Sequence, residues 1–159
     1  MGAITIGIGE WAVSQDPADV IKTFALGSCV AVMIFDTRLR IAGMVHVALP
    51  ESALDADKAA KLPGYFADSG VSTLIEELKR RGVQRNHVWV KLAGGASVMD
   101  PMGVFDIGKR NILAVKKNLW RSSLGPIAED TGGTISRTVA MSVADGAVLL
   151  SSGSRQWNI

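Results

Sequence analysis

The chain has 159 residues, of which 48% are hydrophobic and 20% charged, and its formal net charge is +2. This length and composition suit a globular protein that folds as a single domain over residues 1–159. The small net charge, without clustered aromatic and basic residues, argues against a nucleic-acid-binding protein. No apolar run approaches the roughly 18 residues of a membrane-spanning helix, so we expect no membrane insertion.

The chain contains one cysteine, Cys29, and two histidines, His46 and His87. A single cysteine cannot form an internal disulfide, and the N-terminus lacks the basic segment of a secretory signal. We therefore expect a cytoplasmic protein with a free thiol. The three residues lack the spacing of metal ligands, so we expect neither a metal nor another cofactor.

A first strand is predicted from residue 4, where isoleucines alternate with other residues, and it extends toward residue 13. Turn-forming residues at 14–17 interrupt it, and residues 20–26 are expected to be extended. These segments lead the chain into its most informative stretch.

Residues 29–35 and 41–49 are apolar runs separated by a short polar segment, a pattern that predicts a β-hairpin. A four-residue loop over 36–39, opened by Asp36 in a type I turn, pairs Cys29 directly with His46. Directly opposed residues in antiparallel strands point to one face, with Cβ atoms roughly 4.5 to 5.5 Å apart. The thiol and the imidazole are therefore expected to lie within reach of each other.

In cysteine hydrolases a thiol lies beside an imidazole; the thiol supplies the nucleophile and the imidazole acts as the general base. Cys29 is the candidate nucleophile and His46 the candidate base, while Thr23 is expected to hold the imidazole through its hydroxyl or its carbonyl. Gly27 allows a close backbone approach, and amides near Ser28 are candidates for stabilising an oxyanion. The alternative is structural: a buried thiol, a histidine bonded to a backbone carbonyl, and an ordinary strand threonine.

The remainder of the chain predicts two helices and several strands. Residues 51–61 are a loop or short helix, and residues 64–81 have apolar residues at helical spacing. A strand over 87–93 ends at Gly94-Gly95, and a second helix begins near Asp106 and stops before residue 125. Further strands are predicted at 134–143 and 147–151.

The second helix has a basic outer face, formed by Lys109, Arg110, Lys116, Lys117 and Arg121. This face is either simply solvated or attracts a glutamate-rich helical partner. Asn111, on the same helix, is a candidate for capping or bracing the loop near the catalytic pair. In the last segment we expect Arg137 to bind a carboxylate within the fold and Trp157 to be a candidate for docking on the body.

Short strands with two helices among them predict an α+β fold, in which mixed or antiparallel β-sheets pack in sandwich-like layers and two main helices flank them. The strand over residues 29–35 is apolar on both faces, which is typical of an interior strand.

Several motifs together resemble the CheD family of chemoreceptor glutamine deamidases. They are Thr23-x-x-Leu26-Gly27-Ser28-Cys29-Val30 with Asp36, Gly43-x-x-His46-x-x-Leu49-Pro50, Gly94-Gly95-Ala96, Ile107-Gly108-x-Arg110-Asn111 and Asp130-x-Gly132-Gly133-x-x-x-Arg137. The likeness covers most of residues 20–150. It implies a layered fold, a cysteine-dependent amidohydrolase that needs no cofactor, and catalytic roles for Cys29, His46 and Thr23.

The resemblance also implies partners. The substrates would be glutamine side chains in the cytoplasmic helices of methyl-accepting chemotaxis receptors, which the family converts to glutamate. Some members also hydrolyse receptor methyl esters, and some bind a CheC-type phosphatase. Two other classes remain open: a cysteine protease or transglutaminase with the same catalytic pair, and a non-catalytic adaptor that binds receptors or the phosphatase.

Overall fold

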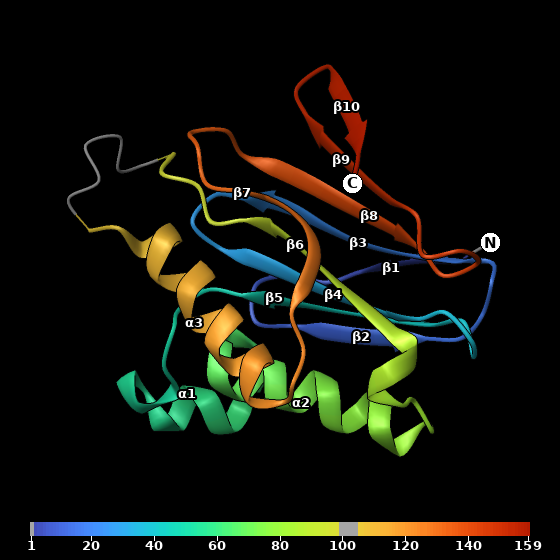
Figure 1. Cartoon of the computed structure of the whole chain (residues 1–159). Helices are drawn as coiled ribbons and strands as arrows, with labels where there is room; N and C mark the ends of the chain where they lie inside the picture. Colours follow the sequence, from blue (N-terminus) through green and yellow to red (C-terminus); the bar gives the residue numbers. More distant parts are fainter. Residues whose placement is uncertain (1, 99–104) are drawn as a thin grey trace.

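Residues 2–98 and 105–159 are described in the computed structural model, where they form two five-stranded sheets (Figure 1). The first sheet has the order β1-β3-β8-β9-β10, with strands at Gly2–Thr5, Asp19–Leu26, Arg137–Ser142, Val148–Ser152 and Arg155–Asn158. The second sheet has the order β2-β5-β4-β6-β7, with strands at Trp11–Ser14, Ile41–Val47, Val30–Asp36, Val88–Gly94 and Pro126–Thr131. Each sheet contains one parallel pair, so both are mixed.

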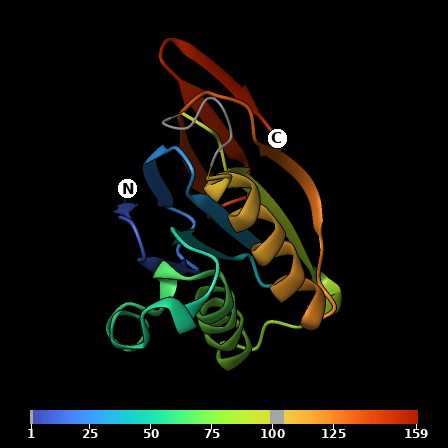
Figure 2. The same cartoon turned by 90° about the vertical axis from the view of Figure 1, so that its left-hand side faces the viewer.

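Three α-helices, α1 (Ala56–Lys61), α2 (Ala67–Arg80) and α3 (Ile107–Arg121), lie in the described part of the chain. Short 3₁₀ turns occupy Ser52–Leu54, Pro63–Tyr65 and Arg85–His87. Helices α2 and α3 lie beside each other against one face of the second sheet, and the first sheet covers the opposite face (Figures 1 and 2). The predicted α+β class, with packed mixed sheets and two main helices, is confirmed.

The second sheet is buried on both faces because it lies between the other two layers. In β4, Val30, Val32 and Ile34 pack toward α2 and α3 in one apolar core. Ala31 and Met33 of the same strand belong to a second core, which lies between the two sheets. This double burial explains why β4 and β5 are apolar on both faces.

The β4–β5 hairpin forms as predicted, but its register is shifted by two residues. Asp36 pairs with Ile41, and Ala31, not Cys29, lies directly opposite His46. The loop is residues 37–40 because the Asp36 side chain accepts hydrogen bonds from two loop amides while its backbone stays in the ladder. A shift of two residues preserves the face on which each side chain lies.

The single N-terminal strand predicted over residues 4–13 is wrong. The segment forms β1 and β2, which belong to different sheets, β1 pairing with β3 and β2 with β5. The chain crosses between the sheets at residues 6–10, where Gly9 has a φ of +80°. The alternating isoleucines correctly indicate extended structure, but an alternating pattern does not specify which sheet a strand joins.

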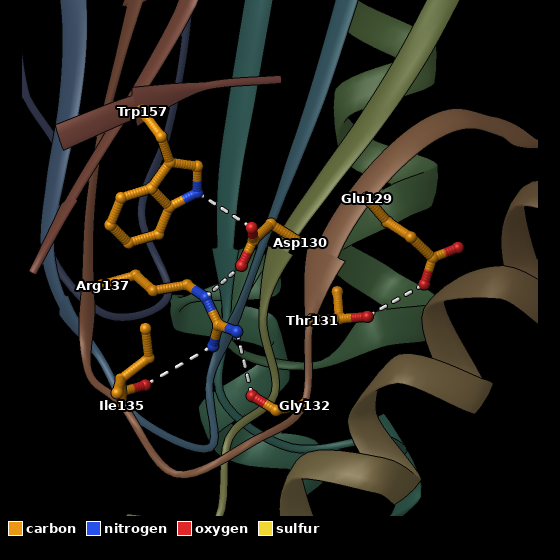
Figure 3. A network of polar contacts seen from close by, with 7 residues as sticks. All are labelled: Glu129, Asp130, Thr131, Gly132, Ile135, Arg137 and Trp157. Atoms are coloured by element: carbon orange, nitrogen blue, oxygen red, sulfur yellow. Dashed lines mark hydrogen bonds and ion pairs between the residues drawn. The ribbon is translucent and has the colours of Figure 1, made fainter.

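Strands β7 and β10 were not predicted. A partly buried ion pair between Asp130 of β7 and Arg137 of β8, joined by Trp157 of β10, links these strands (Figure 3). Arg137 Nε donates to Asp130 Oδ1 at 2.7 Å, and its Nη2 donates to the Gly132 carbonyl at 3.0 Å. Trp157 of β10 donates its indole N–H to the other carboxylate oxygen of Asp130 at 2.9 Å. Arg137 thus binds a carboxylate and Trp157 docks on the body, as expected.

The two main helices lie close to their predicted positions. In α2 the buried positions include Val71, Leu74 and Leu78, the apolar face predicted from the sequence. Asp106 directly precedes α3 in a left-handed conformation, and its side chain makes no capping hydrogen bond. Residues 51–61 form a 3₁₀ turn followed by α1, consistent with the expected short helix.

Candidate active site

His46 lies in the middle layer of the molecule, where its ring faces the other sheet. It belongs to β5 and is buried, and its backbone N–H and carbonyl bond to Glu10 and Gly9. Its Nδ1 lies 2.6 Å from the hydroxyl of Thr23, a buried residue of β3 in the first sheet. The predicted contact between Thr23 and the imidazole is therefore present and uses the hydroxyl, not the carbonyl.

The Thr23 hydroxyl fixes the state of the His46 ring. This hydroxyl donates its single hydrogen to the Ile6 carbonyl at 2.8 Å, so it can only accept from His46. Nδ1 must consequently carry a proton, and in the neutral imidazole Nε2 is then the basic nitrogen. Nε2 is buried and has no hydrogen-bond partner among the described residues. The arrangement leaves a base with a free lone pair.

Cys29 directly precedes β4 and packs, partly buried, against the core between the two sheets. Ala31 is opposite His46, so Cys29, two residues earlier, occupies the diagonal position on the same face. Diagonal neighbours have Cα atoms roughly 7 to 8 Å apart and remain within reach of longer side chains. Cys29 and His46 thus share a face as predicted, although they are not directly opposed.

Burial shifts both groups toward their neutral forms. Burial raises the pKa of the Cys29 thiol and lowers the pKa of His46 from 6.5 to about 4. At neutral pH the resting pair is therefore a thiol and a neutral imidazole, instead of the thiolate that an adjacent imidazole alone would favour. Such a pair reacts by transferring the proton as the sulfur attacks.

The turn before Cys29 lies against the end of β6. The Cys29 carbonyl accepts a hydrogen bond from the Gly95 amide at 2.8 Å, and Gly94 has a φ of +109°. A Cβ on Gly94 would overlap the Cys29 carbonyl oxygen, so this contact requires glycine. The glycine pair predicted to end a strand therefore also holds the segment that contains Cys29.

A pocket of about 220 Å³ opens beside Gly27 and Ser28, the two residues before Cys29. Its other walls are formed by residues 96–98 and by Phe105, Ile107 and Gly108 at the start of α3. The candidate oxyanion-site residues Gly27 and Ser28 thus border a cavity.

Asn111 is buried in α3 and donates from Nδ2 to the carbonyls of Ser28 and Ala48, each at 2.9 Å. Asn111 therefore braces the loop near Cys29 and His46, one of the two roles expected for it. Sequence reasoning did not find the two backbone carbonyls that complete the site, those of Ile6 and Ala48, because a carbonyl leaves no signal in residue type.

Within residues 2–98 and 105–159, no group of three histidine, cysteine, aspartate or glutamate side chains is arranged to hold a metal ion. The α-helices of the same residues are all too short or too polar to cross a bilayer.

Comparison with known proteins identifies the family. A sequence profile described as CheD chemotactic sensory transduction matches residues 48–152. A protein of Syntrophotalea carbinolica named probable chemoreceptor glutamine deamidase CheD is 52% identical over 162 aligned positions, which cover all of both chains. The chain belongs to the CheD family.

Other CheD relatives also match nearly the whole chain. A probable chemoreceptor glutamine deamidase CheD 1 of Syntrophus aciditrophicus is 40% identical and covers 96% of this chain and 95% of its own. The chemoreceptor glutamine deamidase CheD of Thermotoga maritima is 45% identical, covering 91% and 88%. A solved structure of the Bacillus licheniformis hypothetical protein YfiH matches 77% of this chain and 50% of its own, with 11% identity and a TM-score of 0.47.

The profile match begins at Ala48, after Thr23, Cys29 and His46, whereas the alignment with the Syntrophotalea relative covers the segment that contains them. Membership in the CheD family, inferred from the motifs, is thus confirmed over the full length of this chain.

Proposed function

We propose that this chain is a chemoreceptor glutamine deamidase that hydrolyses the side-chain amide of receptor glutamines to glutamate. Cys29 is the nucleophile, His46 the base, and Thr23 the residue that orients the imidazole. The observation that supports this best is the Ile6–Thr23–His46 chain of hydrogen bonds. It directs an unpaired basic nitrogen onto the face that Cys29 occupies.

In the first half-reaction, His46 Nε2 takes the proton of the Cys29 thiol as the sulfur attacks the amide carbon. The carbonyl π electrons move to oxygen, and amide N–H groups of the turn at Ser28 and Cys29 stabilise the resulting oxyanion. When the oxyanion collapses, the C–N bond breaks, His46 returns the proton to nitrogen, and ammonia leaves. A thioester between Cys29 and the substrate side chain remains.

In the second half-reaction, His46 removes a proton from water as the water oxygen attacks the thioester carbon. The tetrahedral intermediate collapses, the C–S bond breaks, and the proton returns to the Cys29 sulfur. The product is glutamate. The neutral resting pair suits both steps because His46 accepts a proton in each.

Membership in the CheD family supports a proposal for the substrate and the location. Relatives carry the name chemoreceptor glutamine deamidase, and we propose that this chain likewise acts on receptor helices in the cytoplasm as a single domain. The pocket beside Gly27 and Ser28 supports entry of a side chain at this point. Lys109, Arg110, Lys117 and Arg121 are exposed on α3 and would attract an acidic receptor helix.

The adaptor alternative also has a supporting observation. Leu113 and Trp120 of α3 and Ile127 of β7 are large, apolar and exposed. Lys116, one turn from Leu113, bonds Glu129 and so holds α3 beside β7. Exposed apolar side chains of this kind support binding of another protein, which we propose is a CheC-type phosphatase.

The deciding experiment is intact-mass analysis of a purified receptor cytoplasmic fragment incubated with the wild-type protein, Cys29→Ala, or the surface control Ser154→Ala. We expect a gain of about 1 Da per converted glutamine with the wild type and the control, and none with Cys29→Ala. Peptide cleavage would indicate a protease instead. An unchanged mass with the wild-type protein, together with binding retained by Cys29→Ala, would establish the adaptor.

A further inference from the structure

The backbone carbonyls around the nucleophile are all occupied. The Gly27 carbonyl accepts from the Ala96 amide at 2.8 Å, and the Cys29 carbonyl accepts from the Gly95 amide at the same distance. The carbonyl between them, that of Ser28, accepts from the side chain of Asn111 at 2.9 Å. Three consecutive carbonyls are therefore anchored to the rest of the protein.

The N–H groups of the same segment, unlike its carbonyls, are not anchored to other described residues. In a trans peptide unit the N–H points away from the C=O, so anchoring the Gly27 and Ser28 carbonyls sets the directions of the next two N–H groups. These belong to Ser28 and Cys29, and neither has an acceptor among the described residues. Two consecutive N–H groups without an acceptor, next to the cavity that Gly27 and Ser28 line, are suited to an anionic oxygen.

Asn111 differs from the other two anchors because it is a side chain from another layer of the fold. Its Nδ2 has two hydrogens, which go to the Ser28 carbonyl and to the Ala48 carbonyl, two residues after His46. A side chain of this size can donate hydrogen bonds to two carbonyls only if it is an amide, since a carboxylate has no hydrogen to donate and leucine has no polar group. Asn111 thus connects the turn before Cys29 to the end of β5, the strand that contains His46.

We propose that Asn111 is a positioning residue that orients the Ser28–Cys29 peptide unit so that the Cys29 N–H stabilises the oxyanion formed on the substrate. This inference rests on the proposed deamidase function. Asn111 acts through the peptide unit and does not touch the substrate. Gly108, one turn earlier, permits the arrangement, because a Cβ there would overlap the Gly95 carbonyl and push α3 away.

The variant that tests this is Asn111→Leu, which has a similar shape and no donor. Its control is Asn118→Leu, because Asn118 lies on the same helix and its side chain, among the described residues, bonds only the Ala114 carbonyl of α3. We expect kcat for receptor-fragment deamidation to fall about 10- to 100-fold in Asn111→Leu, with KM changed less than about threefold. The control is expected to match the wild type.

A second measurement on the same variants separates orientation of the oxyanion donor from collapse of the site. Alkylation of Cys29 by iodoacetamide displaces iodide and forms no oxyanion, so it requires the thiol but not the donor. We expect the alkylation rate and its pH profile in Asn111→Leu to stay within about threefold of the wild type. Equal losses of alkylation and of kcat, or an unchanged kcat, would overturn the proposal.

A measurement on the wild-type protein covers the case in which Asn111→Leu does not fold. Butanal resembles the glutamine side chain with an aldehyde, and the Cys29 thiol adds to it: an S–C bond forms, and the thiol proton passes through His46 to the carbonyl oxygen. We expect the ¹⁵N–¹H signal of Cys29 to move downfield when this adduct forms, because its N–H gains an acceptor. An adduct that leaves the signal in place contradicts the proposal.

The two proposals fail differently. If neither the wild type nor Asn118→Leu releases ammonia from the receptor fragment, the deamidase function fails, and the role of Asn111 fails with it. If both release ammonia and Asn111→Leu does so at the same kcat, only the role of Asn111 is wrong.

Discussion

Two tight turns lie at the two ends of β4, and they differ in whether their backbone N–H groups have hydrogen-bond acceptors. In the loop of residues 37–40 every N–H has an acceptor: the Asp36 side chain takes two, its carbonyl takes one, and the His87 carbonyl takes the fourth. In the turn of residues 27–29 the carbonyls are bonded, whereas the N–H groups of Ser28 and Cys29 have no acceptor within residues 2–98 and 105–159. We call the first turn closed and the second turn open, according to whether their N–H groups have acceptors among the described residues.

The difference concerns N–H donors, because within the described residues the 37–40 turn leaves no N–H without an acceptor, although one oxygen of Asp36, Oδ2, is itself buried without a partner. A buried donor without a partner lowers stability by about 1 to 3 kcal/mol, so open groups persist where a ligand supplies the missing acceptor. The same end of the sheet holds the unpaired His46 Nε2. We therefore expect changes at the open end to affect turnover most, and changes at the closed end to affect only stability.

The largest expected effect is that of His46→Gln at the open end. Glutamine retains a polar group but cannot take the thiol proton, so we expect turnover of the receptor fragment to fall about 10²- to 10⁴-fold. The matched control is His87→Gln, since His87 contributes its backbone carbonyl to the closed turn and not its ring. Comparable losses in both variants would contradict the assignment of His46.

The next effect is a loss of stability at low pH that depends on His46. Its pKa is about 4 in the folded protein and about 6.5 when unfolded, so between these values only the unfolded state binds the proton. The free energy of unfolding should therefore decrease as pH falls from 6.5 toward 4, by up to about 3 kcal/mol from this residue. Urea denaturation at pH 7 and pH 5 measures it, and in His46→Gln this contribution should be absent.

Thr23→Val should reduce both turnover and stability. Valine matches threonine in shape but removes the hydroxyl, so the buried Ile6 carbonyl and the Nδ1–H of His46 each lose a partner. We expect the free energy of unfolding to fall by about 1 to 3 kcal/mol and kcat by about tenfold, because the tautomer is no longer fixed. Thr23→Ser keeps the hydroxyl and should recover most of the kcat.

The smallest effect is expected at the closed turn. Asp36→Ala removes the acceptor of the Arg38 and Leu39 amides, so we expect the free energy of unfolding to fall by about 1 to 2 kcal/mol. Asp36→Asn keeps an acceptor oxygen and should lie closer to the wild type. Turnover per folded molecule should be unchanged in both variants, and a loss of kcat would show that the two turns are coupled.

The sequence is most informative where the two-residue period of a β-strand constrains the positions of side chains. Alternation along β4 and β5 sets which face each side chain occupies, so Cys29 and His46 share a face even though the predicted register was wrong by two residues. The register depends on the loop, whose length is decided by hydrogen bonds from Asp36 that the pattern does not encode. Strand β7 was missed because polar residues such as Glu129 and Asp130 interrupt its apolar pattern at a sheet edge.

The sequence by itself determined the family and the layered α+β class, and it singled out Thr23, Cys29 and His46 as candidate site residues, because these inferences depend on residue type and local spacing. Only the tertiary structure decided that Thr23 reaches His46 through its hydroxyl, that Nε2 has no partner in the described part of the chain, and that Asn111 holds the turn before Cys29. Those contacts join two sheets and a helix, and partners so far apart along the chain meet only when all three layers pack.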